Sequence, residues 1–325
     1  MRTFTAPLCE LGEFEEITKL LKKPNAAAAL TGCVDSQKLH MVYGLSDGFK
    51  YKIIVTFSDL RAKEIYEDYK LYDKNVMFYP AKDLIFYQAD IHGNELVKER
   101  IKVLRRIMEG RPLTVVTTFD GLMSPQVSLD VLKRYVVSVG YQSGINEREL
   151  AKKLVRMGYE KNYQVEAPGQ FSIRGGIVDI FDLTEENPYR IELWGEEVES
   201  IRSFDILSQR SIEKLQSISI YPATEMALSE EELQKGLERI GEEAGKCGEK
   251  FRKAFKTEEA HRLAVQVKEL REQVMEFQTF TNLESYIRYF YQETISFFEI
   301  FDREKSCIFV DEPARVEEHA KAVEL

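Results

Sequence analysis

Hydrophobic and polar positions alternate along the first third of the chain in blocks that predict strands separated by helices. Apolar runs with the length of buried strands alternate with segments whose apolar residues recur at helical spacing. We expect strands at 49–57, 75–81 and 113–119, and helices at 58–72, with Ser58 as its N-cap, and at 94–110. Strands and helices in this order predict parallel βαβ units. Residues 1–134 are therefore expected to form an α/β domain with a doubly wound sheet.

The pattern changes near residue 135 to short alternating strands joined by tight turns. A helical segment at 146–159 precedes them, and SISIYPA (217–223) closes the stretch. QFSIRGGIVDIF (170–181) and YRIELWGEEVESIRSF (189–204) each carry a glycine turn between two alternating runs, which is a β-hairpin signature. Residues 135–225 are therefore predicted to form a small, mostly antiparallel α+β domain.

The remaining segment, 226–325, has a mainly helical pattern and ends in an acidic strand motif. Ser229 and Glu232 are spaced as a capping box, which predicts a helix start. Residues 242–259 are so highly charged that they indicate either a mobile loop or a solvated helix. CIFVDEP (307–313) is an apolar strand followed by two acids. We expect this segment to pack back on the first domain.

Composition excludes several classes of protein. The 325 residues, 44% of them hydrophobic and 31% charged, are typical of a globular chain of two or three domains. We expect no membrane span, because no long apolar run is present, and a cytoplasmic location, because no secretory signal is visible. The four cysteines lie far apart, so neither a zinc site nor a disulfide framework is indicated; they are Cys9, Cys33, Cys247 and Cys307.

The net charge of −10 is unevenly distributed. Residues 1–134 carry +2, residues 135–225 carry −5, and residues 226–325 carry −7. A tight grip on duplex DNA needs several lysines or arginines at phosphates. The most basic run, KERIKVLRR at 98–106, distributes its charges around a predicted helix. The balance of +2 therefore argues against direct binding of damaged DNA by residues 1–130.

One loop has part of the phosphate-binding pattern GxxxxGK[ST], in which glycine backbone amides and a lysine hold phosphates and a hydroxyl binds Mg²⁺. Gly32 and Lys38 stand at the required spacing. Gln37 replaces the second glycine, Leu39 replaces the hydroxyl, and Asp35 would repel a phosphate. The pattern is weak by itself, and a coincidental loop explains it equally well.

The acids that follow the last apolar strand have the form of a second nucleotide motif. Asp311 would hold Mg²⁺ and Glu312 would orient the attacking water. An apolar strand that ends in acids is common, so this signal is weak as well.

The hairpin region carries the most distinctive side chains. Strand alternation in YRIELW puts Arg190 and Trp194, the only tryptophan, on the polar face, and Arg174 precedes the turn of the preceding hairpin. Arginine and tryptophan are enriched at protein-binding hot spots. The alternative is that Trp194 covers a small core while the arginines pair with local acids such as Glu192 or Glu196. The pattern alone favours this alternative.

The sequences FSIRGGIVDIFD and NPYRIELWGEEVESIRSFDILSQRS form a long signature that resembles the module shared by UvrB, the damage-verifying subunit of bacterial nucleotide excision repair, and the transcription-repair coupling factors. The resemblance extends over nearly the whole chain and is densest from 111 to 225. Three departures from UvrB favour the coupling factors. The phosphate loop holds Gln37 and Leu39, residues 78–101 pass from strand to helix without UvrB's long tyrosine-rich hairpin, and Pro313-Ala314 replaces Ser-His after the acids.

The resemblance implies a fold and a set of site residues. The fold is an α/β, P-loop NTPase domain of RecA/UvrB type with a degenerate P-loop, an inserted UvrA-binding domain and a helical part. By motif position, the UvrA-binding residues are Arg174, Arg190 and Trp194. Arg202, Asp205 and Arg210 belong to the signature and are expected to be structural. The remains of a nucleotide site are Gly32, Gln37, Lys38, Leu39, Asp311 and Glu312.

The resemblance also implies a function for the chain. It is expected to be the front piece of a longer protein and a non-enzymatic module that recruits UvrA to a stalled RNA polymerase. ATP and Mg²⁺ would serve only the translocase part of the full-length family, which also contacts RNA polymerase and DNA. A C-terminal regulatory domain is expected to mask the UvrA-binding surface. The alternative is a UvrB-type P-loop ATPase or helicase fragment that acts on damaged DNA.

Overall fold

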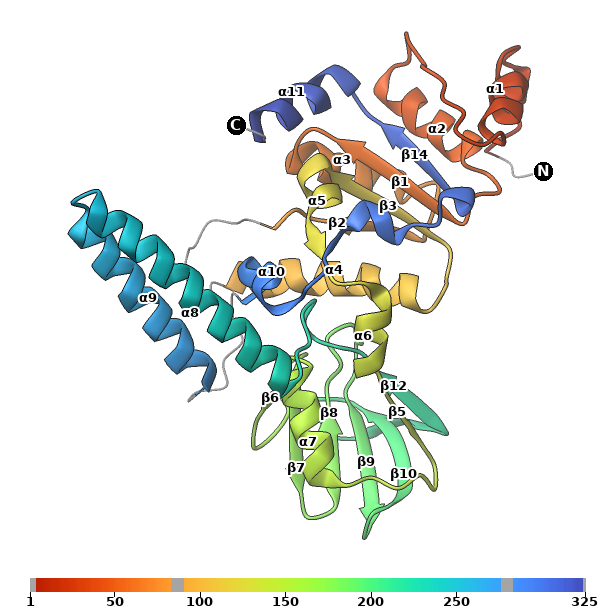
Figure 1. Ribbon diagram of the computed structural model, residues 1–325. Helices are drawn as coiled ribbons and strands as arrows, with labels where there is room; N and C mark the ends of the chain where they lie inside the picture. Colours follow the sequence, from red (N-terminus) through yellow and green to blue (C-terminus); the bar gives the residue numbers. More distant parts are fainter. Residues whose placement is uncertain (1–3, 83–90, 276–282, 324–325) are drawn as a thin grey trace. The chain divides into compact units, whose positions relative to one another are not determined.

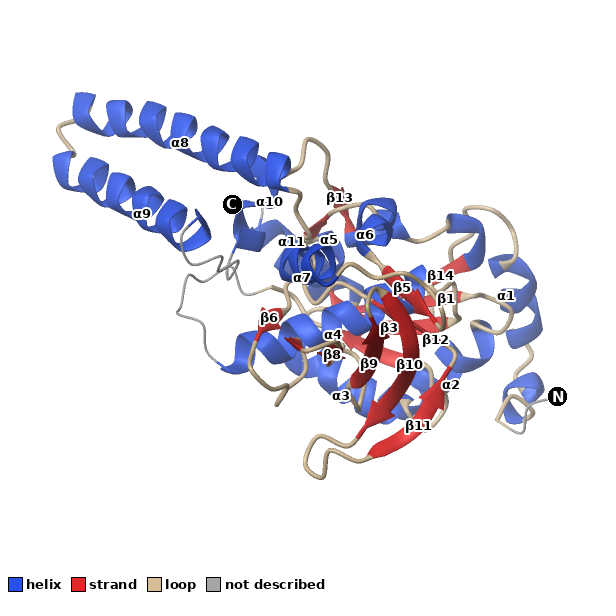
Figure 2. Ribbon diagram, turned by 90° about the horizontal axis from the view of Figure 1, so that it is seen from below, coloured by secondary structure: helices blue, strands red, loops and turns tan. Residues whose placement is uncertain are grey.

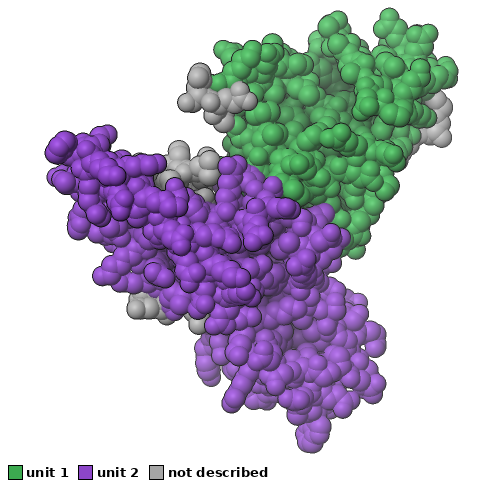
Figure 3. Space-filling view, in the orientation of Figure 1, with its two compact units in different colours: residues 1–83, 102–124, 295–325 green, residues 84–101, 125–294 purple. Residues whose placement is uncertain are grey.

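The computed structural model describes residues 4–82, 91–275 and 283–323, with elements in the order shown in Figure 1. The chain divides into two compact units, which Figure 3 colours separately. Unit 1 comprises Met1–Asp83, Lys102–Ser124 and Ile295–Leu325. Unit 2 comprises Leu84–Ile101 and Pro125–Thr294. The three predicted segments divide the chain differently, and that layout stays a prediction.

Unit 1 is built on a four-stranded parallel sheet. Its strands, in spatial order, are β14 (Ser306–Val310), β1 (Tyr51–Thr56), β3 (Leu113–Thr118) and β2 (Val76–Tyr79). In the register of this sheet, Ile54 lies between Phe309 and Val116. The parallel sheet confirms the α/β class, whereas the closer assignment to the P-loop NTPase fold stays a prediction. The acidic strand near the end of the chain supplies the edge strand β14.

Helices contribute to the core of unit 1 through apolar side chains. Leu39 of α2 and Ile65 of α3 pack with Ile54 of β1, and Ser58 caps α3 through a bond from the Arg61 backbone N–H. The helices and short strand of this unit are η1 (Pro7–Glu10), α1 (Phe14–Leu21), α2 (Asp35–Leu45), α3 (Asp59–Tyr69), α5 (Phe119–Met123), β13 (Ile295–Ser296), η3 (Phe297–Ile300), η4 (Arg303–Lys305) and α11 (Pro313–Val323). Helix α4 (Ile91–Met108) contributes its residues from Lys102 onward.

Unit 2 contains a six-stranded sheet, most of whose strands are visible in Figure 2. Its spatial order is β11 (Ser211–Leu215), β10 (Glu197–Phe204), β9 (Tyr189–Trp194), β8 (Ile177–Ile180), β7 (Gln170–Arg174) and β6 (Glu160–Lys161). All neighbours are antiparallel except β6 and β7, so both predicted hairpins are confirmed. Gly175 and Gly176 form the first turn and Gly195 the second, all with positive φ. That backbone conformation favours glycine.

One face of this sheet is buried and the other is polar. Phe171, Val178 and Ile191 are fully buried and pack with Leu154 of helix α7 (Glu147–Arg156), which Asn146 caps. Strands β5 (Val137–Gly140) and β12 (Ser217–Ile220) form a separate antiparallel pair. Because side chains alternate along a strand, the residues between these core positions point to the opposite face.

The rest of unit 2 is mainly helical. Its elements are β4 (Pro125–Gln126), α6 (Leu129–Tyr135), α8 (Glu230–Lys253), α9 (Thr257–Met275), η2 (Leu283–Tyr286) and α10 (Ile287–Phe290). The predicted capping box of Ser229 and Glu232 is present at the start of α8. Helices α8 and α9 pair along their length and cover most of 242–259, so the solvated helix is the correct alternative for that segment.

Two further predictions concern membrane crossing and the segment 78–101. None of the described helices combines the length and the apolar composition that a bilayer crossing requires. The predicted direct passage from strand to helix over 78–101 includes residues 83–90, which lie outside the described residues. That prediction therefore stays open.

Candidate functional site

The polar face of the six-stranded sheet is organised around one buried carboxylate, that of Asp179. In the register, Asp179 lies between Ser172 and Arg190, and Arg174 is two residues from Ser172 on the same face. Asp179 is 2% exposed, so its charge requires cationic partners. Both predicted binding arginines supply them, because this pairing of β7, β8 and β9 brings their side chains to the same carboxylate.

Arg190 is held by several contacts inside the unit. Its Nε donates to Asp179 Oδ1 at 2.7 Å, and its Nη2 donates to Asp179 Oδ2 at 2.8 Å and to Gln209 Oε1 at 2.8 Å. The guanidinium also lies over the Phe204 ring, 4.2 Å from its centroid. Hydrogen bonding to Asp179 raises the pKa of Arg190 further above its ordinary value, so the side chain is always charged. Only 16% of this side chain is exposed.

Arg174 is bound more loosely and is more accessible. Its Nη2 lies 3.4 Å from Asp179 Oδ2, and 37% of its side chain is exposed. The guanidinium is 5.3 Å from the ring centroid of Tyr163, which is 83% exposed. Sequence reasoning missed Tyr163. Tyr163 lies near Arg174 because β6 and β7 pair in parallel, and no local pattern in the sequence predicts that pairing.

Trp194 is a second exposed aromatic side chain on this face. It ends β9, just before the Gly195 turn, and is 81% exposed. The alternative in which Trp194 covers a small core is therefore wrong. The companion expectation that the arginines pair with local acids is right, but the acid is Asp179 rather than Glu192 or Glu196. We call the surface of Tyr163, Arg174, Arg190 and Trp194 the docking face.

All three residues expected to be structural are engaged within the unit, Arg202 and Asp205 through their side chains and Arg210 through its backbone. The Arg202 guanidinium pairs with Glu192 of the adjacent strand. Asp205 Oδ1 accepts hydrogen bonds from the backbone N–H of Ser208 at 2.8 Å and from its hydroxyl at 2.6 Å. Arg210 takes part through its backbone carbonyl, which accepts the Asp205 N–H at 2.9 Å.

Three of the six residues predicted for a degenerate nucleotide site, Lys38, Asp311 and Glu312, come together in unit 1 in an ion-pair network. Lys38 Nζ lies 2.5 Å from Glu312, 3.3 Å from Asp311 and 3.5 Å from Asp35. Arg61, which sequence reasoning did not include, lies 3.1 Å from Asp311 and 3.0 Å from Asp35. The hydrogen bond to Glu312 raises the pKa of Lys38 far above its ordinary value. We call this set, with Glu64 as its remaining member, the Lys38 network.

The residues of this loop do not fit the ligands of a phosphate-binding site. Leu39 points into the core beside Ile54, where no metal could reach it. Helix α2 has already begun at Asp35, so the Lys38 backbone N–H donates to the Val34 carbonyl at 2.9 Å instead of facing a phosphate. Two cations of the network face four carboxylates, which would repel a triphosphate.

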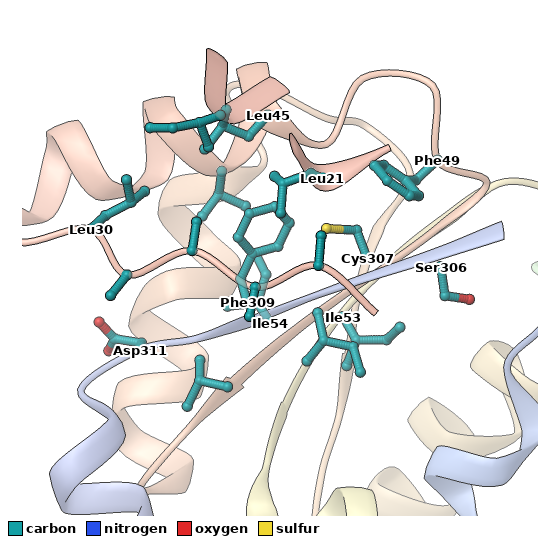
Figure 4. Close-up of a pocket in the computed structure, with 18 of the residues that line it drawn as sticks. Leu21, Leu30, Leu45, Phe49, Ile53, Ile54, Ser306, Cys307, Phe309 and Asp311 are labelled. Carbon is teal, nitrogen blue, oxygen red and sulfur yellow. The ribbon is translucent and has the colours of Figure 1, made fainter. Parts of the chain in front are cut away.

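An apolar cavity of about 1490 Å³ lies beside the Lys38 network in unit 1 (Figure 4). Residues 26–32 line it on one side and β14 on the other, and the segment that carries Leu30 runs along β14 without pairing to it. Its apolar lining includes Leu21, Leu45, Phe49, Ile53, Phe301 and Phe309. Lys38, Arg61 and Asp311 border it, and the cations among them are already paired. Within the described residues, no group of acids, histidines and cysteines is arranged to hold a metal.

Comparison with known proteins gives matches at two scales, one over a single domain and one over most of the chain. Residues 137–226 match the family model of the UvrB interaction domain. The chain is also 36% identical, over 269 residues, to the transcription-repair-coupling factor of Bacillus subtilis (strain 168), an overlap of 82% of this chain and 22% of that protein. The chain is homologous to the UvrB-like N-terminal region of transcription-repair-coupling factors.

Other transcription-repair-coupling factors match over a shorter stretch. That of Staphylococcus aureus (strain bovine RF122 / ET3-1) is 28% identical over 236 residues, or 71% of this chain and 20% of that protein. That of Staphylococcus epidermidis (strain ATCC 12228 / FDA PCI 1200) is 29% identical over 231 residues, or 70% and 19%. The chain thus spans about a fifth of the length of these coupling factors. The docking face lies within the matched UvrB interaction domain.

Proposed function

We propose that this chain is the module through which a transcription-repair-coupling factor recruits UvrA, and that UvrA binds the docking face. The observation that carries the proposal is Trp194, an 81% exposed tryptophan on a polar sheet face inside a UvrB interaction domain. Large exposed aromatics that are flanked by fixed arginines are typical hot spots of protein interfaces.

Physical chemistry supports this use of the surface. Burying the indole against a partner removes a large apolar area from water, which favours association. Asp179 holds both arginines in place before binding, so little side-chain entropy is lost when a partner arrives. The surrounding segment 135–225 is acidic, at −5, so attraction would come from individual arginines rather than from bulk charge. Arg174, at 37% exposure, is the one better placed to meet an acidic group of UvrA.

We further propose that this region is not an enzyme. The paired cations of the Lys38 network and the inward-pointing Leu39 argue against a UvrB-type ATPase or helicase acting on damaged DNA. ATP and Mg²⁺ then belong to the translocase part of the whole protein, as do the contacts with RNA polymerase and DNA. Masking of the docking face by a C-terminal regulatory domain is part of the same proposal.

The test is a titration of nucleotide-free UvrA with the chain and two variants. Trp194→Ala is expected to weaken binding about 30-fold or more, equivalent to about 2 kcal/mol, because the apolar anchor is lost. Phe255→Ala is the matched control. Phe255 is 93% exposed, at the turn between α8 and α9 in the same unit, and its removal should leave the Kd unchanged. Equal binding by all three proteins would overturn the proposal.

A further inference from the structure

We infer that the loop of residues 205–210 presents Leu207 as a second apolar anchor for the same partner, and that Arg190 acts as the positioning residue that holds this loop. The inference rests on the proposed function, since it assigns further roles within the surface that binds UvrA. It concerns Leu207 and Gln209, to which sequence reasoning gave no role, and changes the role of Arg190 from contact to support.

The loop is closed by its own hydrogen bonds. The Asp205 N–H donates to the Arg210 carbonyl at 2.9 Å, and the Gln209 N–H donates to the Asp205 carbonyl at 2.8 Å. Asp205 Oδ1 accepts two further bonds from Ser208. A loop closed in this way keeps its shape in solution. It leaves Leu207 91% exposed, so the backbone is ordered around a side chain that packs on almost nothing in this unit.

Gln209 connects this loop to the docking face. Its backbone has a φ of +58°, a left-handed conformation that is uncommon for a residue with a side chain. Its Nε2 donates to the Ile206 carbonyl at 2.8 Å, and its Oε1 accepts from Arg190 Nη2 at 2.8 Å. These bonds stabilise the unusual backbone conformation. Contact with Arg190 therefore fixes where the loop presents Leu207.

Most of the N–H donors of Arg190 are engaged inside the unit. A guanidinium has five N–H donors, and the Nε–H and both Nη2 hydrogens of Arg190 are directed to Asp179 and Gln209. One face of the group is stacked on Phe204, and only 16% of the side chain is exposed. The contribution of Arg190 to binding must then come mainly from what it positions.

Arg190 and Trp194 are close enough together to lie within one interface of ordinary size. Arg190 and Trp194 are four residues apart on one face of β9, which separates them by about 13 Å. A standard interface covers roughly 800 Å² on each partner, a disc of about 16 Å radius. Such a disc centred between Trp194 and Arg190 reaches Gln209, whose side chain contacts Arg190, and Leu207 lies two residues from Gln209 along the chain.

A double-mutant cycle in UvrA binding tests the inference. Leu207→Ser should weaken binding about tenfold or more, because burial of one leucine is lost. Gln209→Ala should weaken it roughly fivefold by releasing the loop, yet add little in the Leu207→Ser background. Leu71→Ser, at a 79% exposed leucine of unit 1, is the matched control and should leave the Kd unchanged. Thermal melts should show all four variants folded, since Leu207 and Leu71 are exposed.

The outcomes separate this inference from the proposed function. If Trp194→Ala abolishes binding while Leu207→Ser leaves it intact, the second anchor is wrong and UvrA recruitment stands. If the effects of Leu207→Ser and Gln209→Ala simply add, Gln209 does not act through Leu207, and the positioning role of Arg190 is wrong. If Trp194→Ala and Leu207→Ser both bind as tightly as the unaltered chain, the proposed function is wrong, and the inference that rests on it is wrong as well.

Discussion

The docking face and the Lys38 network each pair an arginine with a buried carboxylate, but different side chains remain exposed in the two regions. Asp179 is 2% exposed and holds Arg190, and the Asp311 side chain is 8% exposed and holds Arg61. In the Lys38 network, the described cations are paired with acids of the same unit. On the docking face the arginines are paired as well, yet Trp194 and Tyr163 remain exposed.

On the proposal that UvrA binds the docking face, charge alone is a poor marker of a binding site in this protein. A motif with a lysine and two acids becomes an internal network, whereas an acidic domain carries the binding surface we propose. In both regions the ion pairs join residues of different elements within one unit. What distinguishes the docking face is its two exposed aromatic side chains, Tyr163 and Trp194, whose burial gains free energy only when a partner covers them.

The comparison predicts the largest effect at Asp179. Asp179→Ala removes the carboxylate that two arginines share, so we expect unit 2 to lose about 3 kcal/mol of unfolding free energy. UvrA binding should weaken as well, because the arginines are no longer held. Urea unfolding followed by circular dichroism measures the first effect. Asp179→Asn keeps the shape of the side chain and should be less damaging. An unfolding midpoint unchanged in Asp179→Ala would contradict the central role of this residue.

A smaller effect, on stability alone, is expected at Asp311. Its removal leaves Lys38 paired with Glu312 and Asp35, and Arg61 paired with Asp35 and Glu64. We therefore expect Asp311→Ala to cost about 1.5 kcal/mol of unfolding free energy and to leave the Kd for UvrA unchanged. Asp130→Ala, at an 85% exposed acid, is the control and should change neither quantity. Weaker UvrA binding by Asp311→Ala would remove the distinction between the two regions.

The smallest expected effect is the response to nucleotide. A fluorescent ATP analogue with Mg²⁺ should show no saturable binding to the chain, since Lys38 is engaged and the α2 backbone is already helical at the loop. Lys38→Ala should give the same trace. Micromolar binding that disappears in Lys38→Ala would instead support a P-loop ATPase.

Local patterns predicted the elements well and the long-range pairings poorly. The hairpins around Gly175 and Gly195 follow from glycine turns between alternating runs, so sequence suffices for them. The strand at 306–310 was predicted, but its place beside β1 depends on contacts about 250 residues apart. The same holds for Arg61, which meets Asp311 across 250 residues.

The candidate site divides in the same way. The polar-face position of Arg190 and Trp194 followed from strand alternation. Arginine and tryptophan are residue types enriched at protein interfaces, which made both residues candidates. That Arg190 pairs with Asp179 could not be predicted, because it depends on the register of β8 against β9. Leu207 could have been noticed as an apolar residue in a polar loop, although only the structure gives its 91% exposure. The interpretation of Gly32, Gln37, Lys38 and Leu39 as an incomplete motif stays a prediction, and the ion-pair network around Lys38 was not foreseen.

Hydrogen–deuterium exchange of the chain with and without UvrA tests the contrast between the two regions most directly. We expect UvrA to protect backbone amides of β7 to β10 and of the loop at 205–210, and to leave α2 and β14 unchanged. Protection confined to α2 and β14, with none in the hairpins, would contradict the assignment of the docking face as the site that binds UvrA.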